Sequence, residues 1–269
     1  MASFSVVSNI ASANAQANLQ STNLGLNKAL TRLSSGFRIN YSGDDAAGLA
    51  VANAYRSNVA IISQGVRNAN DGLSSLQVKD GAANNVSTLL DRLSTLATQA
   101  ASGSTTDASR VTLNQEFQDV LAEIQRESDV ASLTSNAGFS VFISNETTSA
   151  DGKVSGTISA VTTTSLTLSG HVITSQALAA SAVVAVASAV SVLGKAQGTI
   201  GTLQNRLQFA ISLAQTQVVN NQAADSRIRD ANIAEESANL TRFSILSQSG
   251  VAALAQANQQ SSAVLGLLR

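Results

Sequence analysis

The sequence predicts a mainly α-helical fold in which long helices run antiparallel, with a small insert rich in β-hairpins. Apolar residues recur at steps of three and four through both flanks of the chain, which is the spacing of a coiled-coil seam. The 269 residues include no proline, whereas average usage would give roughly 13. Because proline interrupts helices, its absence suits long, unbroken ones. Only the middle, from 139 to 176, is instead rich in Ser, Thr, Val and Gly.

The two ends of the chain carry no charged residue over 1–27 and 243–268. A first helix is expected over about 5–34 and a last one over about 233–268. Ala, Ser, Asn and Gln fill the positions between the apolar ones, so neither helix has a strongly hydrated face. We therefore expect the ends to pair with each other and then with copies from other subunits, as in a polymer. The apolar residues expected at this interface are Leu19, Leu26, Leu30, Leu33, Phe37, Leu240, Val251, Leu254, Leu265 and Leu268.

Three further helices are expected between the ends. Gly36, Gly43 and Gly48 indicate a bend after the first helix. A second helix is expected over about 56–101, with the seam Val59, Ile62, Val66, Ala69, Leu73, Leu76, Ala83, Leu90, Leu93 and Ala97. Asp107 is the expected N-cap of a third helix that runs through Arg126, with the seam Leu113, Phe117, Leu121 and Ile124. A fourth is expected over about 179–218 on Ile200, Leu203, Leu207, Ile211 and Val218.

The middle segment predicts one or two hairpins. Asp151-Gly152 is a turn signal between short β-prone runs. The run from Val161 alternates weakly, with Leu166 and Leu168 as the residues expected to point inward.

One stretch, 177–193, is apolar enough to suggest a membrane span. It is short for that role and contains three serines. Its larger residues, Val183, Val186, Val190 and Leu193, recur by three and four, which favours a packed helix seam over membrane insertion. The start of the chain lacks the basic and apolar regions of a secretory signal, so none is expected.

The composition argues against catalysis and against several classes of ligand. The net charge is -1 and no basic stripe is present, so nucleic acid is not an expected partner. The chain has no cysteine and one histidine, His171, so no catalytic site, metal site or cofactor is expected. Asp44 and Asp45 could form a metal pair, but two acidic residues at the start of a helix are better explained by its dipole. Asn145-Glu146-Thr147 matches the N-glycosylation pattern, which we do not expect to be used without a secretory signal.

Distinctive segments occur near both ends. The front contains LSSGFRIN at 33–40 and GDDAAGLAVA at 43–52. The back contains NRL at 205–207, SRIRDAN at 226–232, ILSQSG at 245–250, LAQANQ at 254–259 and VLGLLR at 264–269. The first group closely resembles the amino-terminal signature of bacterial flagellin, and the second resembles its carboxy-terminal signature.

The resemblance implies a structural subunit that self-assembles into the bacterial flagellar filament used for motility. Residues 1–45 with 230–269 would form an inner terminal coiled-coil domain, 46–138 with 177–229 a helical-bundle domain, and 139–176 a small Ser/Thr-rich β segment on the outside. The filament is extracellular, and the subunit would be exported without a cleaved signal peptide. The implied partners are further copies of the chain, the flagellar export apparatus, hook-associated proteins, and a flagellin export chaperone at 240–268.

The resemblance also implies a surface that host flagellin-sensing Toll-like receptors recognise. Its pattern is similar to Arg92, Leu96 and Gln99, which share one helical face, together with Glu116. The same residues could instead contact a neighbouring subunit. Two alternatives to a filament subunit stay open: a hook–filament junction protein of the same superfamily, and a membrane signalling coiled coil that rests on 177–193 alone.

Overall fold

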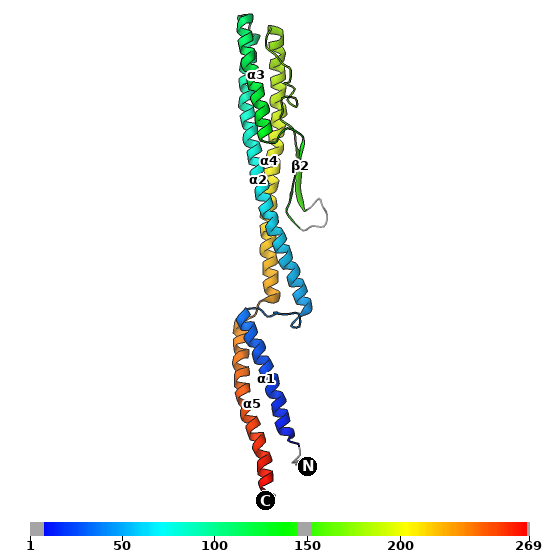
Figure 1. Ribbon diagram of the computed structural model, residues 1–269, viewed down its shortest axis with the longest axis vertical. Coiled ribbons are helices and arrows are strands. Elements are labelled where there is room, and N and C mark those ends of the chain that lie inside the picture. Colours follow the sequence, from blue (N-terminus) through cyan, green and yellow to red (C-terminus); the bar gives the residue numbers. More distant parts are fainter. Residues whose placement is uncertain (1–7, 145–151, 268–269) are drawn as a thin grey trace. The chain divides into compact units, whose positions relative to one another are not determined.

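The computed structural model describes residues 8–144 and 152–267, and confirms a mainly helical chain with one small antiparallel sheet. Its elements, shown in Figure 1, are α1 (Ile10–Ser35), α2 (Ala46–Ala101), α3 (Asp107–Val130), β1 (Ala137–Phe142), β2 (Lys153–Ile158), α4 (Gln176–Arg229) and α5 (Ile233–Leu267). The chain divides into two compact units. The terminal unit comprises 1–57 and 221–269, and the central unit comprises 58–220.

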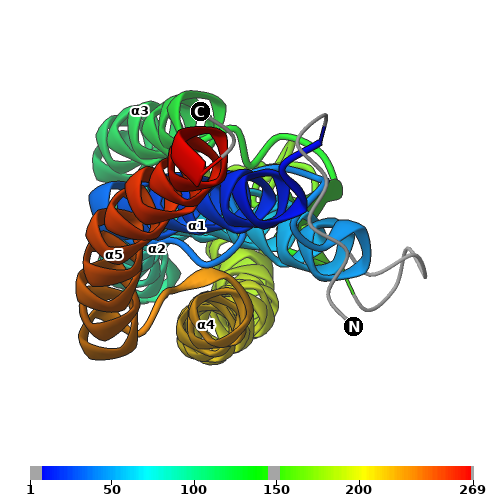
Figure 2. The same cartoon turned by 90° about the horizontal axis from the view of Figure 1, so that it is seen from below.

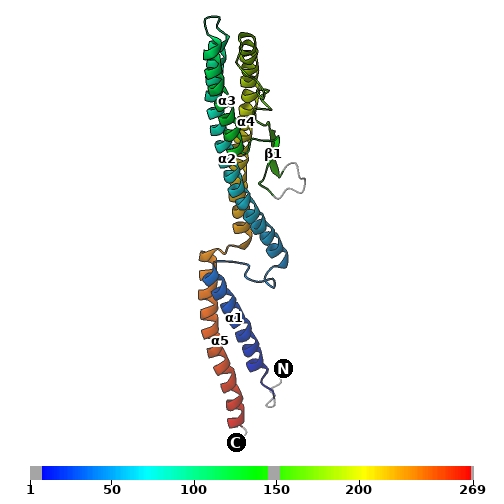
Figure 3. The same cartoon turned by 45° about the horizontal axis from the view of Figure 1, so that its top comes forward.

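In the terminal unit, α1 and α5 lie side by side and run antiparallel (Figures 1 and 3). The early part of α1 meets the late part of α5. There the Asn9 side chain donates a hydrogen bond to the Ala257 carbonyl at 2.9 Å. At the other end of the pair, Arg32 reaches Glu236, also at 2.9 Å. Asn9 also caps α1 by accepting the Ser12 N–H at 3.0 Å. The expected helix start at residue 5 lies outside the described residues.

The α1–α5 pair packs closely at two glycines, yet buries little. An added Cβ on Gly25 would lie 2.7 Å from the Phe243 ring, and one on Gly250 would lie 3.1 Å from Leu19. Small residues are needed at these points because the helices approach closely there. Even so, Ala29 is the one residue of α1 that is fully buried.

In the central unit, α2, α3 and α4 pack around a continuous apolar core. Seen end-on, α3 and α4 occupy separate positions beside α2 (Figure 2). The predicted seams are confirmed at their centre, where the residues are at most 6% exposed: Ile62, Leu76, Leu90, Leu93, Phe117, Leu121, Ile124, Ile200, Leu203 and Leu207. Other seam residues, such as Val66, Leu73, Leu113 and Ile211, are partly buried against this core.

Two predicted details were wrong. The N-cap of α3 is Thr106, whose hydroxyl accepts the Ser109 N–H at 3.3 Å, while Asp107 lies in the first turn. Thr and Asp are both good N-caps, so the sequence fixes the start of this helix only to within one residue.

The seam over the first part of α4 also differs. Val186 and Leu193 are buried, but Val190 is 44% exposed, and the remaining buried positions are the alanines Ala179, Ala182 and Ala189. Small side chains such as alanine allow helices to approach closely at these positions. The most apolar 18-residue window of α4 has a mean hydropathy of 2.1, enough for a membrane span by length and composition alone. The five buried residues of this stretch belong to the core of the central unit.

The middle segment forms one hairpin, β1–β2, in which Ala137 pairs with Ile158 and Phe142 with Lys153. β1 lies against α2 because Gly65 and Gly72 leave room: a Cβ on Gly65 would lie 1.8 Å from the Ile143 carbonyl oxygen. No second hairpin occurs in the described residues from 159 to 175, which form turns. Leu166 and Leu168 point inward as predicted, at 0% exposure. The expected turn at Asp151-Gly152 lies partly outside the described residues, because Asp151 is not among them.

Candidate assembly interface

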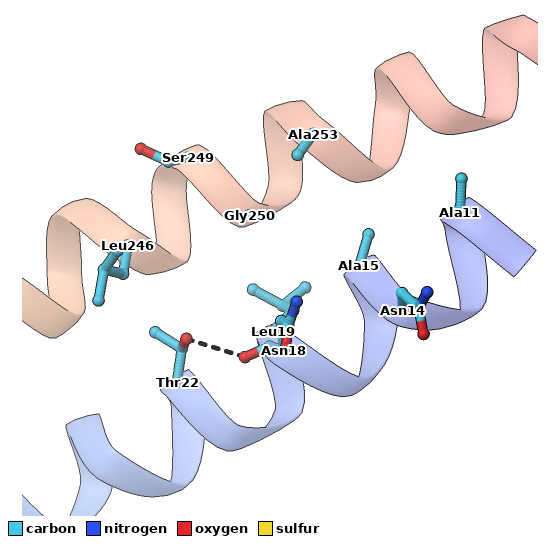
Figure 4. A pocket seen from close by; sticks show the side chains of 10 residues that line it. All are labelled: Ala11, Asn14, Ala15, Asn18, Leu19, Thr22, Leu246, Ser249, Gly250 and Ala253. Atoms are coloured by element: carbon cyan, nitrogen blue, oxygen red, sulfur yellow. Dashed lines mark hydrogen bonds between the residues drawn. The ribbon is translucent and has the colours of Figure 1, made fainter.

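The α1–α5 pair leaves an open groove that contains no charged residue. It has a volume of about 440 Å³ and is lined by Ala11, Asn14, Ala15, Asn18, Leu19 and Thr22 of α1 and by Leu246, Ser249, Gly250 and Ala253 of α5. Figure 4 shows Ala15 and Ala253 pointing toward one another across it. The Thr22 hydroxyl donates to the Asn18 carbonyl within α1 at 2.9 Å. Such small apolar and neutral polar side chains suit contact with another helix, because no ion would have to be desolvated.

The residues predicted for the interface fall into two groups in a single chain. Leu19, Leu26, Leu33, Phe37, Leu240 and Leu254 are partly buried within the terminal unit. Leu30 and Val251 remain 56% and 57% exposed. The side chain of Leu265 and the whole of Leu268 lie outside the described residues. Leu30 and Val251 therefore have the most apolar surface left for contact with a second copy.

The predicted set does not include four large apolar residues that are exposed in the uncharged stretches of α1 and α5. Ile10 and Leu24 on α1 are each 65% exposed, and Ile245 and Leu246 on α5 are 58% and 46% exposed. Leu24 also lines a second groove along α1, of about 350 Å³, with Gln16, Leu19, Gln20, Asn23 and Asn27. All four lie off the chosen heptad ladder. The absence of charge over 1–27 and 243–268, rather than the period of the apolar residues, was the signal that could have found them.

Charges in the terminal unit gather toward one end of the helix pair. Lys28 pairs with Asp44 at 2.9 Å, and the Asp44 side chain is 4% exposed. Burial opposes ionisation of Asp44, but the Lys28 hydrogen bond, the N–H groups of Asn40 and Tyr41, and the Lys28 charge together lower its pKa. Asp45 accepts the Gly48 N–H at 2.8 Å and so caps the start of α2.

These two aspartates therefore have separate partners. Among the described residues, no group of three or more His, Asp or Glu side chains is placed to hold a metal ion.

The predicted receptor patch lies in the central unit, and the structure separates its members. Arg92 on α2 and Glu116 on α3 form an ion pair, with Arg92 Nε 2.8 Å from Glu116 Oε1. Gln99 is also exposed, on the same face of α2 and about two turns further along it. Leu96 is 1% exposed and packs in the core, so it offers no surface to a partner. A recognition surface here would consist of Arg92, Gln99 and Glu116.

Two family models match the chain and together cover most of it. One, described as the bacterial flagellin N-terminal helical region, matches residues 6–142. The other, described as the bacterial flagellin C-terminal helical region, matches residues 183–268.

Curated relatives match over nearly their full length. A flagellin of Halalkalibacterium halodurans is 36% identical over 92% of this chain and 95% of its own. A flagellar filament 33 kDa core protein of Treponema phagedenis is 32% identical over 95% of this chain and 96% of its own. Among solved structures, a Bacillus cereus flagellin is 24% identical, with a TM-score of 0.48 over 55% of this chain and 88% of that one.

Proposed function

The chain belongs to the bacterial flagellin family, and we propose that it is the structural subunit that self-assembles into a flagellar filament used for motility. One observation carries the proposal at the level of residues: α1 and α5, which carry no charge over 10–27 and 243–267, pair with each other but leave much of their apolar surface exposed. A stable isolated protein rarely leaves so uniform an uncharged surface open to water.

Assembly would proceed by ordering and burial of this helix pair. In a free subunit the pair holds few fully buried residues, so its ordering is only weakly favoured. Packing against neighbouring copies would bury the exposed leucines, isoleucines and valines, at about 25 cal/mol per Å² of apolar surface. This gain would offset the entropy lost on ordering the ends. Repeated head-to-tail contacts that do not close into a ring produce an open helical filament.

We expect the export chaperone to bind the same apolar surface that packs in the filament. Because α5 exposes apolar residues before assembly, a flagellin export chaperone would cover 240–268 until the subunit reaches the export apparatus. The subunit would be exported without a cleaved signal peptide and would join the extracellular filament. Hook-associated proteins would contact the two ends of that filament. The flagellin family is a family of structural proteins, and the mechanism needs no catalytic residue or cofactor.

Recognition by a host Toll-like receptor is a second proposed role, limited to the monomer. The exposed Arg92–Glu116 pair and Gln99 would form the contact surface. Receptor activation by Arg92→Ala with Glu116→Ala should fall relative to that by the wild-type monomer. An unchanged response from the doubly substituted chain would remove this role.

The assembly function is tested by seeded growth. The purified full-length chain is dissociated by heating, returned to neutral buffer with short filament seeds, and imaged by negative-stain electron microscopy. Regrowth of filaments of uniform width is expected. The relatives' names favour a filament protein over the hook–filament junction protein. A chain that stays monomeric beside competent seeds would reverse that preference.

A further inference from the structure

The break between α4 and α5 is joined to the segment that follows α1. Phe37 and Asp230 form an isolated antiparallel β-bridge. Its hydrogen bonds run from Arg38 N–H to the Arg229 carbonyl at 2.6 Å and from Ala231 N–H to the Gly36 carbonyl at 2.8 Å. Two segments nearly 200 residues apart in the sequence therefore meet through their backbones at one end of the helix pair.

Side chains reinforce this junction. The Arg229 guanidinium lies over the Phe37 ring, 4.4 Å from its centroid, which is cation–π geometry. Arg38 donates to the Ile228 carbonyl at 2.8 Å. Gly36 closes α1 in the left-handed conformation, with φ of 76°, and its N–H donates to the Arg32 carbonyl. A residue with a Cβ would be strained at this position.

The polar contacts elsewhere in the pair specify its alignment only weakly. Apart from the junction and the Arg32–Glu236 ion pair close to it in the sequence, the interhelical hydrogen bonds join Asn, Ser and backbone groups, such as Ser247 Oγ with Asn23 Oδ1 at 3.3 Å. The facing side chains are mostly Ala, Ser, Asn and Gln, and these residues recur along both helices. After a slip of one turn, similar polar groups would again face each other, and among the close contacts only those of Gly25 with Phe243 and of Gly250 with Leu19 would be lost. Specific polar contacts are what usually define register between helices of this kind.

We propose that residues 36–38 and 228–231 form a clasp that sets the register of α1 against α5. Phe37 and Arg229 are positioning residues: the ring and the guanidinium hold the bridge in one alignment, and a shift of one residue would break both of its hydrogen bonds. The clasp thereby determines which apolar side chains the terminal unit presents together. That last step alone rests on the proposed assembly function.

The register can be measured by cross-linking, because the chain has no native cysteine. Asn23→Cys with Ser247→Cys reports the observed alignment, and Asn23→Cys with Ser244→Cys reports a slip of about one turn. The readout is the ratio of the two disulfide yields in the full-length, unpolymerised chain. The ratio is compared between the unaltered clasp and the clasp variants Arg229→Gln and Phe37→Ala.

We expect a ratio well above one with the clasp intact, and a severalfold lower ratio in both variants. The conservative substitution Arg229→Lys should keep the ratio high. Arg227→Gln is the matched control, since Arg227 is an exposed arginine on the same turn of α4 and should leave the ratio unchanged. If both yields fall together at a constant ratio, the clasp adds stability but does not set the register, and the proposal fails. A ratio near one with the clasp intact also overturns it. A chain that keeps the register yet never grows filaments from seeds contradicts the assembly function and leaves the clasp standing.

Discussion

The terminal and central units use the same helical spacing of apolar residues but bury them to very different extents. In the central unit, Leu76, Leu90 and Leu93 of α2 are all 0% exposed. In the terminal unit, Leu30 of α1 occupies an equivalent seam position and is 56% exposed. The difference teaches that a seam is completed by the number of helices around it, and not by the period of its sequence.

A third helix accounts for the contrast. In the central unit, α3 contributes Phe117, Leu121 and Ile124 to a core shared by α2 and α4. In the terminal unit, α1 has α5 alone beside it, and two helices bury only the narrow seam along which they touch. We therefore expect the central unit to be stable in a single chain and the terminal unit to depend on neighbouring copies.

The largest expected effect is the loss of assembly on deletion of residues 1–35. This deletion removes α1 and leaves α5 without its partner, while the core of the central unit keeps every residue. We expect a soluble, helical chain that forms no filaments by electron microscopy. Its cooperative thermal transition by circular dichroism should match that of the central unit in the full-length chain. Filaments grown from the truncated chain would refute the role given to α1.

A pair of alanine substitutions separates folding from assembly. Phe117→Ala empties a fully buried site and should destabilise the central unit by about 3–5 kcal/mol in denaturant unfolding. Leu30→Ala removes an exposed side chain and should change monomer stability by less than about 0.5 kcal/mol. It should nevertheless raise the critical concentration for seeded growth. A Leu30→Ala chain that assembles normally would show that this residue lies outside the interface.

Two glycines of α2 make a finer comparison within the central unit. Gly65→Ala would drive a Cβ into the Ile143 carbonyl and force the hairpin off α2, at a cost of about 1–3 kcal/mol. At Gly81 nothing lies within 4 Å of an added Cβ, so Gly81→Ala should stabilise α2 by about 0.5–1 kcal/mol. Denaturant midpoints measure both. Equal and opposite shifts are not required, but the same sign at both sites would contradict the packing of β1 on α2.

The smallest expected effect is a dependence of the stability of the terminal unit on pH in the acidic range. The pKa of Asp44 is lower in the folded chain than in the unfolded chain, mainly because of Lys28 and nearby N–H groups that outweigh burial. Its stabilising effect is therefore complete above a pH of about 4 and is lost as the pH falls through the lower folded value. Asp44→Asn should destabilise the terminal unit at neutral pH, and the difference from wild type should shrink as the solution is acidified. A difference that persists at low pH would mean that the carboxylate charge is not its source.

Much of the helical architecture could be predicted because it depends on local chemistry. The seam through Leu76, Leu90 and Leu93 follows from the repeat of apolar residues, and the end of α1 at Ser35 follows from Gly36. The exact N-cap of α3 could not be predicted, because Thr106 and Asp107 are both competent caps and the difference between them is small. The burial of Leu96 was not predicted, because the family pattern suggested an exposed position although Leu96 packs in the core of α2.

The candidate interface divides in the same way. Its location in the charge-free ends was visible in the sequence, because a helical stretch without charge can be covered by a partner without desolvating an ion. Which of its residues remain exposed was not visible, since Leu19 and Leu30 look equivalent along α1 and only the approach of α5 makes them different. Whether the two helices share one alignment depends on contacts such as Arg229 over Phe37, which join segments far apart in the chain.

The sequence alone therefore determined the helices, the apolar seams and the uncharged ends, because each depends on residues within a few turns of one another. The tertiary structure decided which alanines of α4 enter the core, how the hairpin rests on the glycines of α2, and how the segment after α1 meets the break between α4 and α5. Those features depend on how closely two surfaces approach, and the distance between surfaces is not a property of either segment by itself.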